Sequence, residues 1–262
     1  MKIPFFSKSK KENLNISVFG LTNIGLKRRS NEDSFLSLPG FDSGAQVQAL
    51  MAVADGMGGH SSGEVASGIA ISCIRRDLSF EKVRCKNNES YIREYMAKTL
   101  HDANSEIFVK GGESSERAMG TTCTVGLIRN GTLHLAHVGD SRAYLLRGNK
   151  LSQISVDHSW VMEQVAAGKL TQDEARTHPN RNIITRALGI QESVEVQIDS
   201  IPLRRNDRIL ICSDGLSGLV DDCDINSALA EFTVKESVGR LLKLAILAGG
   251  DDNITVVLGE IL

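Results

Sequence analysis

Short apolar runs alternate with turns rich in glycine and acidic residues along most of the chain. The runs Leu50–Ala54 and Ile209–Cys212 contain no polar side chain, which is typical of strands buried on both faces. Similar runs predict strands at residues 16–21, 34–38, 47–54, 121–129, 132–138, 142–147, 194–198, 207–213 and 254–261. The tripeptide Arg129-Asn130-Gly131 separates two of these runs and indicates a hairpin turn.

Three longer segments carry apolar residues at the three- and four-residue spacing of a helix. They are residues 62–78, 89–109 and 235–248. The second repeats its apolar side chains at Ile92, Met96, Leu100, Ala103 and Ile107. The order of strands and helices predicts an α+β fold in which two sheets pack together with helices outside. Because the elements interlock in sequence, residues 14–262 are expected to form one domain.

Residues 157–190 interrupt this pattern. Short helical pieces are expected at residues 160–167 and 171–176, next to the polar turn His178-Pro179-Asn180. Long irregular segments beside active sites commonly carry specificity, so this segment is predicted to be a mobile flap. An ordinary surface connection is the alternative.

The composition restricts the kinds of partner. The 262 residues carry a net charge of −2, which favours neither nucleic acid nor a membrane surface. The five cysteines show no Cys-x-x-Cys spacing, so reduced, mostly buried thiols in a cytoplasmic protein are the simpler interpretation. Residues 1–13 are basic and lack the apolar stretch of a signal peptide, and a disordered tail is expected there.

Acidic motifs lie at the ends of several predicted strands. They are Asn31-Glu32-Asp33, Asp55-Gly56, Gly139-Asp140-Ser141, Ser213-Asp214-Gly215 and Asp251-Asp252-Asn253. A buried carboxylate is costly without a partner, and several such ends meeting would form an all-oxygen site suited to Mg²⁺ or Mn²⁺. Two such ions can activate a water and bind a phosphoryl oxygen, which predicts a phosphorylated substrate. An isolated Asp-Gly after a strand is typical of a plain turn, so the pattern alone leaves both interpretations open.

The ordered set of motifs resembles the metal-dependent protein serine/threonine phosphatases, the type 2C or PPM family, over about residues 16–261. The motifs that carry the resemblance are Arg28-Arg29-Ser30-Asn31-Glu32-Asp33, Asp55-Gly56-Met57-Gly58-Gly59-His60, Gly120-Thr121-Thr122, Val138-Gly139-Asp140-Ser141-Arg142, Asp157-His158-Ser159, Thr185-Arg186-Ala187-Leu188-Gly189, Ser213-Asp214-Gly215-Leu216 and Gly250-Asp251-Asp252-Asn253. The Asp-Gly-Met-Gly-Gly-His form is similar to the bacterial branch. The resemblance implies two packed antiparallel sheets flanked by helix pairs, with the metals at one end.

The same resemblance assigns the ligands of two Mn²⁺ or Mg²⁺ ions. Asp55 would bridge them. Glu32 and the backbone carbonyl of Gly56 would complete one ion. Asp214 and Asp252 would complete the other.

Four further positions follow from the resemblance. Asp33 would hold a coordinated water, and Asp140 would bind a third, weaker ion shared with Asp214. Arg28 would bind the substrate phosphate, a task that suits the guanidinium fork. Arg29 is expected to be solvated.

One position departs from many eukaryotic members of the family. Met57 stands where they carry a histidine, a proposed general acid, and methionine cannot donate a proton. His60 is expected to be structural and is not assigned this role. A metal-bound water is the expected proton donor to the leaving alkoxide.

The implied activity is hydrolysis of phosphoserine and phosphothreonine in proteins. A metal-bridging hydroxide would attack phosphorus in line, without a phosphoenzyme, and Asp55, Asp214 and Arg28 would carry the catalysis. The implied substrates are phosphoproteins, in particular those of a serine/threonine kinase of the same organism. The chain is expected to act as a monomer.

Three other interpretations compete with this one. Cys123 and Arg129 show the Cys-x₅-Arg spacing of a cysteine phosphatase, but the residues between them predict a strand. Residues 20–27 resemble a P-loop, but the lysine is one place late and no serine or threonine follows it. A non-catalytic member that binds phosphoprotein is the third, and the presence of the expected ligands argues against it. His134 and His137 lie in a predicted strand, as buried structural histidines would.

Overall fold

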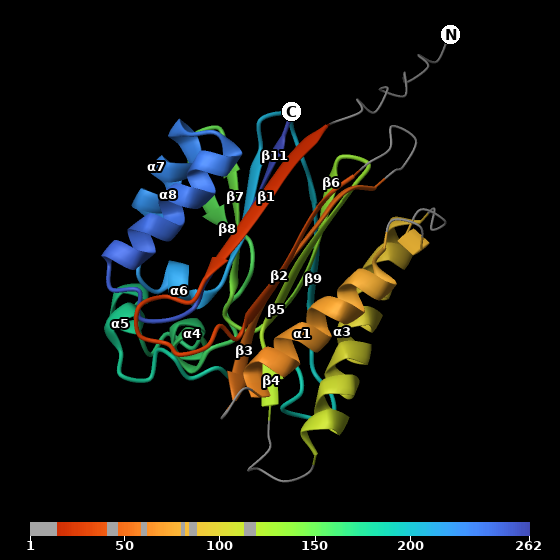
Figure 1. The fold of residues 1–262 in the computed structure, drawn as a ribbon, viewed down its shortest axis with the longest axis vertical. Helices are drawn as coiled ribbons and strands as arrows, with labels where there is room; N and C mark the ends of the chain where they lie inside the picture. The colour runs from red at the N-terminus through yellow and green to blue at the C-terminus, as the bar shows by residue number, and fades with distance from the viewer. Residues whose placement is uncertain (1–14, 41–46, 59–61, 80–81, 84–87, 113–118) are drawn as a thin grey trace.

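The computed structural model describes residues 15–40, 47–58, 62–79, 82–83, 88–112 and 119–262. Two antiparallel sheets face each other in these residues, with helices on both outer faces (Figure 1). The tail expected at residues 1–13 and the structural role expected for His60 lie outside the described residues.

The first sheet has the strand order β2-β3-β5-β6-β9, and all of these pairings are antiparallel. Its strands are β2 (Asp33–Pro39), β3 (Val47–Gly58), β5 (Cys123–Arg129), β6 (Thr132–Val138) and β9 (Gln197–Pro202). The short strand β4 (Met119–Thr121) pairs with the last residues of β3.

The second sheet has the strand order β1-β11-β10-β7-β8, also antiparallel. Its strands are β1 (Ile16–Asn23), β11 (Ile254–Ile261), β10 (Arg208–Cys212), β7 (Arg142–Arg147) and β8 (Lys150–Gln153). The central strands β10 and β11 are almost entirely buried, which explains their continuous apolar runs.

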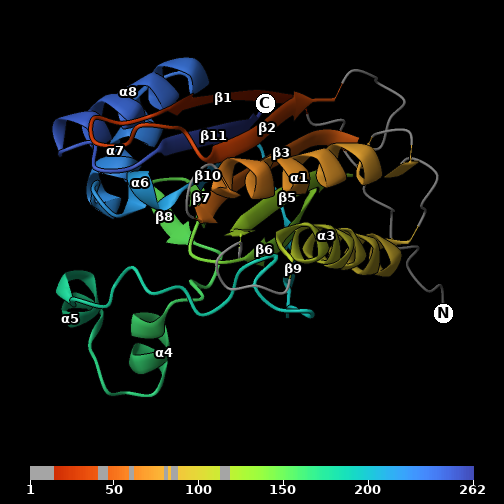
Figure 2. The same cartoon turned by 60° about the horizontal axis from the view of Figure 1, so that its bottom comes forward.

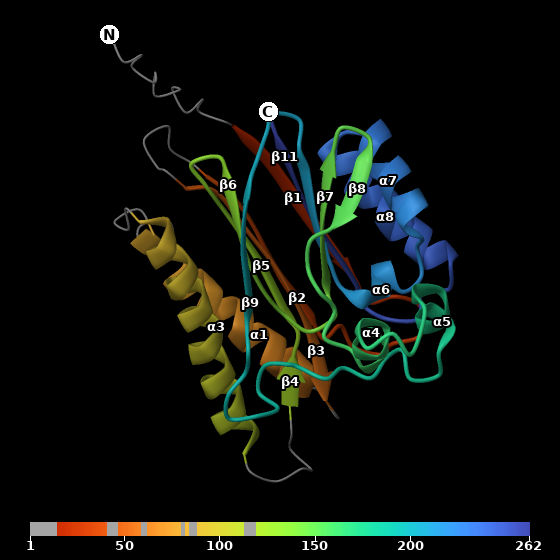
Figure 3. The ribbon, with the colours of Figure 1, turned by 180° about the vertical axis from the view of Figure 1, so that it is seen from behind.

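A pair of helices covers the outer face of each sheet. Helices α1 (Ser62–Asp77) and α3 (Glu89–Gly111) lie on the first sheet, and α7 (Asp222–Glu231) and α8 (Val234–Leu247) lie on the second (Figure 3). One apolar cluster lies under each pair and a third lies between the sheets. The predicted α+β architecture, two packed antiparallel sheets flanked by helix pairs, is confirmed.

The apolar run of β3 shows how one strand contributes to two of these clusters. Leu50 and Ala52 pack toward α1 and α3, whereas Met51 and Val53 pack toward the second sheet. Successive side chains of a strand point to opposite faces, so a strand covered on both sides needs apolar residues at every position.

Helices α4 (Trp160–Ala166) and α5 (Gln172–Thr177) lie outside both sheets (Figure 2). They belong to the segment 157–190, and residues of both helices line one cavity together with residues of the short helix α6 (Asp214–Ser217). A capping box of Thr171 and Glu174 fixes the start of α5.

The structure differs from the sequence expectation at several boundaries. β3 does not end before Asp55 but continues to Gly58, because β4 supplies a new partner there. The strand expected at 121–129 is interrupted at Thr122, whose amide donates to the Asp55 carbonyl (2.9 Å). β9 begins three residues later than expected, and the short elements α7 and β8 were not anticipated.

Candidate metal centre

Two carboxylates from neighbouring strands of the first sheet lie side by side. Asp33 begins β2, Asp55 lies in β3, and the strand register pairs these two residues directly. Directly opposed residues have Cβ atoms about 4.5–5.5 Å apart. Burial raises the pKa of Asp55 well above its ordinary value, and the nearby charges of Asp33 and Asp214 raise it further.

The backbone at Asp55 is fixed on both of its polar groups. Its N–H donates to Thr122 Oγ1 (3.0 Å), and its carbonyl accepts from the N–H of Thr122 (2.9 Å) and from Thr121 Oγ1 (2.9 Å). The Thr122 hydroxyl also lies 2.7 Å from Ser141 Oγ. This buried network holds the strand at the point where its carboxylate faces the second sheet.

The second sheet contributes two more carboxylates. Asp214 is the first residue of α6 and follows β10 after Ser213, and Asp252 precedes β11, the neighbouring strand. Burial raises the pKa of Asp214, and Asp252 adds to this, while a hydrogen bond with Asp55 lowers it. Each of these two carboxyl groups shifts the pKa of the other, so Asp55 and Asp214 lie close together between the two sheets.

Asp33 is held by hydroxyl groups of the second sheet. Its Oδ2 accepts from Ser213 Oγ (2.8 Å) and from Thr255 Oγ1 (2.6 Å). Burial raises the pKa of Asp33 to about 7, although these two hydrogen bonds oppose the shift. Ser213 and Thr255 therefore connect the sheets beneath the carboxylate cluster, which consists of Asp33, Asp55, Asp214 and Asp252.

Glu32 and Gly56 face the start of α1. The Gly56 N–H donates to the Glu32 carbonyl (3.2 Å), and Ser67 Oγ of α1 donates to the same oxygen (2.6 Å). A Cβ on Gly63 would lie 2.3 Å from Glu32 Oε2 and 2.8 Å from the Gly56 carbonyl oxygen. Both oxygens therefore point at the small space that Gly63 leaves beside the helix.

Asp140 lies on the turn between β6 and β7. The turn needs a glycine before it, since Gly139 has a φ of +111° and a Cβ there would lie 2.6 Å from the Thr122 side chain. Burial raises the pKa of Asp140 to about 8, and the charges of Asp214 and Asp157 add to the shift.

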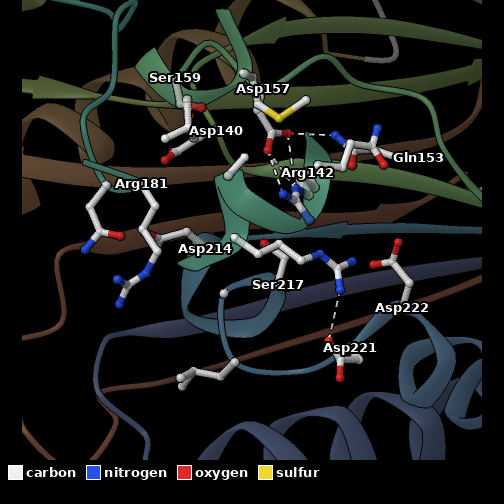
Figure 4. A pocket seen from close by; sticks show the side chains of 18 of the residues that line it. Asp140, Arg142, Gln153, Asp157, Ser159, Arg181, Asp214, Ser217, Asp221 and Asp222 are labelled. Carbon is white, nitrogen blue, oxygen red and sulfur yellow. Dashed lines mark hydrogen bonds and ion pairs between the residues drawn. The ribbon is translucent and has the colours of Figure 1, made fainter. Parts of the chain in front are cut away.

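Asp140 and Asp214 both line a cavity of about 270 Å³ beside the cluster (Figure 4). Residues of α4, α5 and α6 form its other walls. At the edge of this cavity, two nitrogens of Arg142 donate to Asp157 Oδ2 (2.7 and 2.9 Å). Gln153 donates to the same carboxylate (2.7 Å).

The cluster has the unsatisfied oxygens that a hard cation needs. Oδ1 of Asp33, Asp140 and Asp214 is in each case buried without a hydrogen-bond partner. Buried polar atoms are almost always satisfied in folded proteins, and an unpaired one calls for an explanation. Carboxylate and carbonyl oxygens without thiolate or imidazole match Mn²⁺ or Mg²⁺, so the donor set fits these ions.

The carboxylates lie near one another, but their oxygens do not surround a single point. Among the described residues, no three histidine, cysteine or acidic side chains converge at ligand distance. One of the expected ligands has another contact, because Asp252 pairs with Arg28 (2.6 Å). Like charges also repel each other without a cation between them.

Arg28 lies at the edge of this cluster. Its guanidinium binds Asp252 Oδ2 and is about half exposed. The hydrogen bond with Asp252 raises the pKa of Arg28, and the nearby Asp55 and Asp214 add to the shift. Arg28 thus faces the carboxylates and is also accessible to a ligand from solvent. Arg29 is exposed, as expected.

The residues of the rival interpretations lie elsewhere. Cys123 is fully buried in β5, and burial raises the pKa of its thiol to about 12, so it is not a nucleophile. Residues 20–23 belong to β1 and form no phosphate loop. His134 and His137 are buried and hydrogen-bonded to Ser200 and Thr124, and burial lowers the pKa of both.

Sequence reasoning missed the residues that support the cluster. Thr122, Ser213 and Thr255 each contact an acidic residue, and Asn253 contacts the backbone around Arg28. Three of the four lie inside or beside the motifs quoted above, but position in a motif does not reveal a hydrogen-bond partner.

Comparison with known proteins identifies the family. The model of the protein phosphatase 2C family matches residues 27–243. The serine/threonine phosphatase Stp of Listeria monocytogenes is 34% identical over 241 residues, which cover 91% of this chain and 93% of that protein. The serine/threonine protein phosphatase PstP of Mycobacterium tuberculosis is 40% identical over 241 residues, covering 90% of this chain and 43% of PstP.

Solved structures agree with this result. The M. tuberculosis phosphatase PstP/Ppp has a TM-score of 0.82 at 37% identity, covering 94% of this chain and 98% of that one. The Streptococcus agalactiae serine/threonine phosphatase has a TM-score of 0.86 at 34% identity, covering 94% and 100%. The PstP catalytic domain in complex with two manganese ions has a TM-score of 0.81 at 35% identity, covering 95% and 99%. The chain belongs to the protein phosphatase 2C family.

Proposed function

We propose that this chain is a metal-dependent serine/threonine protein phosphatase whose centre holds two Mn²⁺ or Mg²⁺ ions. The observation that carries the proposal is the meeting of carboxylates from both sheets, with three buried oxygens that no protein group satisfies. The family and the relatives named above support the activity.

The residues that would hold the ions divide between the sheets. Asp55 would touch both ions, Glu32 and the Gly56 carbonyl would complete one, and Asp214 and Asp252 would complete the other. The ions supply an activated water and neutralise charge on the phosphoryl oxygens when they are bound. The gathered carboxylates, with their raised pKa values, support this assignment because a cation relieves their repulsion.

Asp33 and Asp140 would serve at the edges of the centre. Asp33 keeps one oxygen on Ser213 and Thr255, which leaves Oδ1 free to orient a water. Asp140 lies across from Asp214 in the same cavity, and this supports a third, weaker site between them.

Arg28 would bind the substrate phosphate. It is accessible, faces the carboxylates and is already engaged by one anionic oxygen, that of Asp252. Met57 follows Gly56 at this edge and cannot donate a proton, so the chain's own residues supply no acid at that position.

Segment 157–190 would act as a flap over the centre. Backbone hydrogen bonds join the two ends of the segment at its base. Trp160 N–H donates to the Ile183 carbonyl (2.8 Å), and Thr185 N–H donates to the His158 carbonyl (2.9 Å). Beyond this base, α4 and α5 form one wall of the cavity that contains Asp140 and Asp214. The exposed ion pair Arg176–Asp221 (3.2 Å) joins the flap to the body, and the small contribution of such a pair to stability supports a mobile flap.

The substrates are phosphoproteins, and we propose that a serine/threonine kinase of the same cell produces them. We further propose a cytoplasmic monomer without nucleic-acid or membrane partners. The near-neutral net charge and the free cysteines of the described residues support this. Among the described residues, no helix is both long enough and apolar enough to cross a bilayer. Size-exclusion chromatography with light scattering tests the monomer, and phosphoproteomics with and without the active protein tests the substrates.

Hydrolysis of a phosphothreonine peptide and of p-nitrophenyl phosphate tests the activity. We expect turnover with Mn²⁺, loss of turnover in EDTA, and recovery when Mn²⁺ is added back. Cys123→Ser should retain turnover, because its buried thiol takes no part. Turnover that survives thorough chelation, or a phosphocysteine, would overturn the proposal. Metal binding without turnover would indicate a phosphoprotein-binding module.

A further inference from the structure

The segment that carries Arg28 has little regular structure of its own. Residues 24–32 connect β1 to β2 without strand pairing, and Arg28 lies on an exposed stretch in the middle of them. A side chain on such a segment is positioned only if the backbone on both sides of it is held. The contacts that hold this backbone therefore decide where the guanidinium lies.

One buried side chain makes three of these contacts. The Asn253 Nδ2 group donates to the carbonyls of Ile24 (2.9 Å) and Ser30 (3.0 Å), and Oδ1 accepts from the N–H of Glu32 (2.8 Å). The three contacts lie on both sides of Arg28. Asn253 is 5% exposed, so water cannot easily replace them.

Asparagine is the side chain that these contacts require. The amide offers two donors and an acceptor on one short side chain, and here it uses all three. Aspartate has the same size and could still accept from Glu32, but it would place an oxygen against two carbonyl oxygens. The residue is itself fixed, because its N–H donates to Asp252 Oδ1 (2.8 Å) and its carbonyl leaves no room for a Cβ on Gly215 (2.0 Å).

Backbone contacts complete the docking of the segment. Leu26 N–H donates to the Gly250 carbonyl (2.7 Å). Gly25 has a φ of +79°, and a Cβ there would lie 2.2 Å from the Asp252 carbonyl oxygen. The segment thus rests directly on residues 250–253.

We infer that Asn253 is a positioning residue that holds the Arg28 segment in place for phosphate binding. The inference rests on the phosphate contact proposed for Arg28, and deepens it. Asn253 touches no reacting atom, so its effect on catalysis passes through the segment that it holds.

A double-mutant cycle for phosphopeptide hydrolysis tests this inference. We expect Arg28→Ala and Asn253→Asp each to raise KM, on the order of tenfold, with a smaller fall in kcat. The KM of the double variant should lie within about twofold of the KM of Arg28→Ala, because displacing the segment affects phosphate binding only while the segment carries the arginine. Full additivity, or an unchanged KM in Asn253→Asp, would overturn the inference.

The chain offers a matched control. Asn104 makes the same kind of clamp elsewhere, since its Nδ2 donates to the carbonyls of Gln191 and Glu192 (3.0 Å each) and its Oδ1 accepts from Gly189 N–H (2.8 Å). Asn104→Asp imposes the same chemical change on another segment. Its effect on KM should be independent of Arg28→Ala, and equal coupling in both cycles would contradict a specific role of Asn253.

A second variant avoids the added charge. Gly25→Ala displaces the segment through its Cβ and leaves Asn253 intact. It should show the same coupling to Arg28→Ala, and additivity here would also overturn the inference.

Hydrogen–deuterium exchange separates this inference from the proposed function. Amides of residues 24–31 should exchange faster in Asn253→Asp than in the unaltered chain. In Asn104→Asp, the exchange rates of the same amides should not change. If Arg28→Ala leaves KM unaltered, the proposed phosphate contact fails. Faster exchange in Asn253→Asp would still support a positioning role, and unchanged exchange would reject it.

Discussion

Asp140 shows at the scale of one residue how burial prepares a carboxylate for a cation. Its pKa is raised to about 8, mainly by burial, and one of its oxygens has no partner. The unfolded chain holds this group near its ordinary pKa of about 3.9. Between these values, the folded metal-free protein keeps a proton that the unfolded chain has lost.

This difference predicts the pH dependence of stability. Since the native state binds more protons, the free energy of unfolding should fall as pH rises, by roughly 1.4 kcal/mol per unit for each such group. Asp140→Asn removes one group, so its stability relative to the unaltered chain should increase by about 1.4 kcal/mol per unit between pH 5 and 7. Urea unfolding in EDTA measures this difference. Parallel stability curves for the two proteins would contradict the raised pKa.

At the scale of one element, replacing either of two glycines of α1 by alanine should have opposite effects. A Cβ on Gly63 would collide with Glu32 Oε2 (2.3 Å) and the Gly56 carbonyl carbon (2.7 Å), whereas a Cβ on Gly68 would meet nothing within 4 Å. Gly63→Ala should displace Glu32 Oε2 and the Gly56 carbonyl and raise the Mn²⁺ concentration needed for half-maximal turnover by about tenfold or more, since both are expected ligands.

Gly68→Ala is the control on the same helix. Alanine is favoured over glycine inside a helix, so thermal unfolding should show a gain of about 0.5–1 kcal/mol with unchanged turnover. If Gly63→Ala also left the Mn²⁺ dependence unchanged, Glu32 and Gly56 would not be ligands.

The same scale shows what the sequence could predict. Long periodic segments such as α3, and apolar runs such as β10, follow from local pattern, because tertiary structure reinforces it. The continuation of β3 past Asp55 does not, because β4 stabilises it from a distant part of the chain. Helix α7 buries Ile225, Ala228 and Leu229, and three apolar positions are too few to show a clear period.

The acidic residues could be found individually from their motifs, but their meeting depends on the packing of the two sheets. Asp33 is separated by 180 residues from Ser213 and by 222 from Thr255, and its contacts with both arise only in the fold. Asn253 and Thr122 were likewise not predictable, because a hydrogen bond to a distant backbone leaves no periodic signal.

At the scale of the whole molecule, the flap predicts a division of substrates. Replacing residues 166–180 with a short Gly-Ser linker removes α5 but keeps the closed base between residues 158–160 and 183–185. The ranking of phosphopeptides by kcat/KM should change, whereas p-nitrophenyl phosphate needs only the metal centre and Arg28 and should be affected much less. Equal losses on both kinds of substrate would show that the segment supports the core instead.

The central claim is that carboxylates from the two sheets hold two divalent ions together. Calorimetric titration of Mn²⁺ into the chelator-treated protein tests this most directly, with Asp55→Asn and Asp214→Asn as variants whose folding is checked by circular dichroism. The account predicts two tight ions in the unaltered chain, and in each variant the loss of at least one of them together with turnover. Two ions bound with unchanged affinity by folded Asp55→Asn or Asp214→Asn would contradict it.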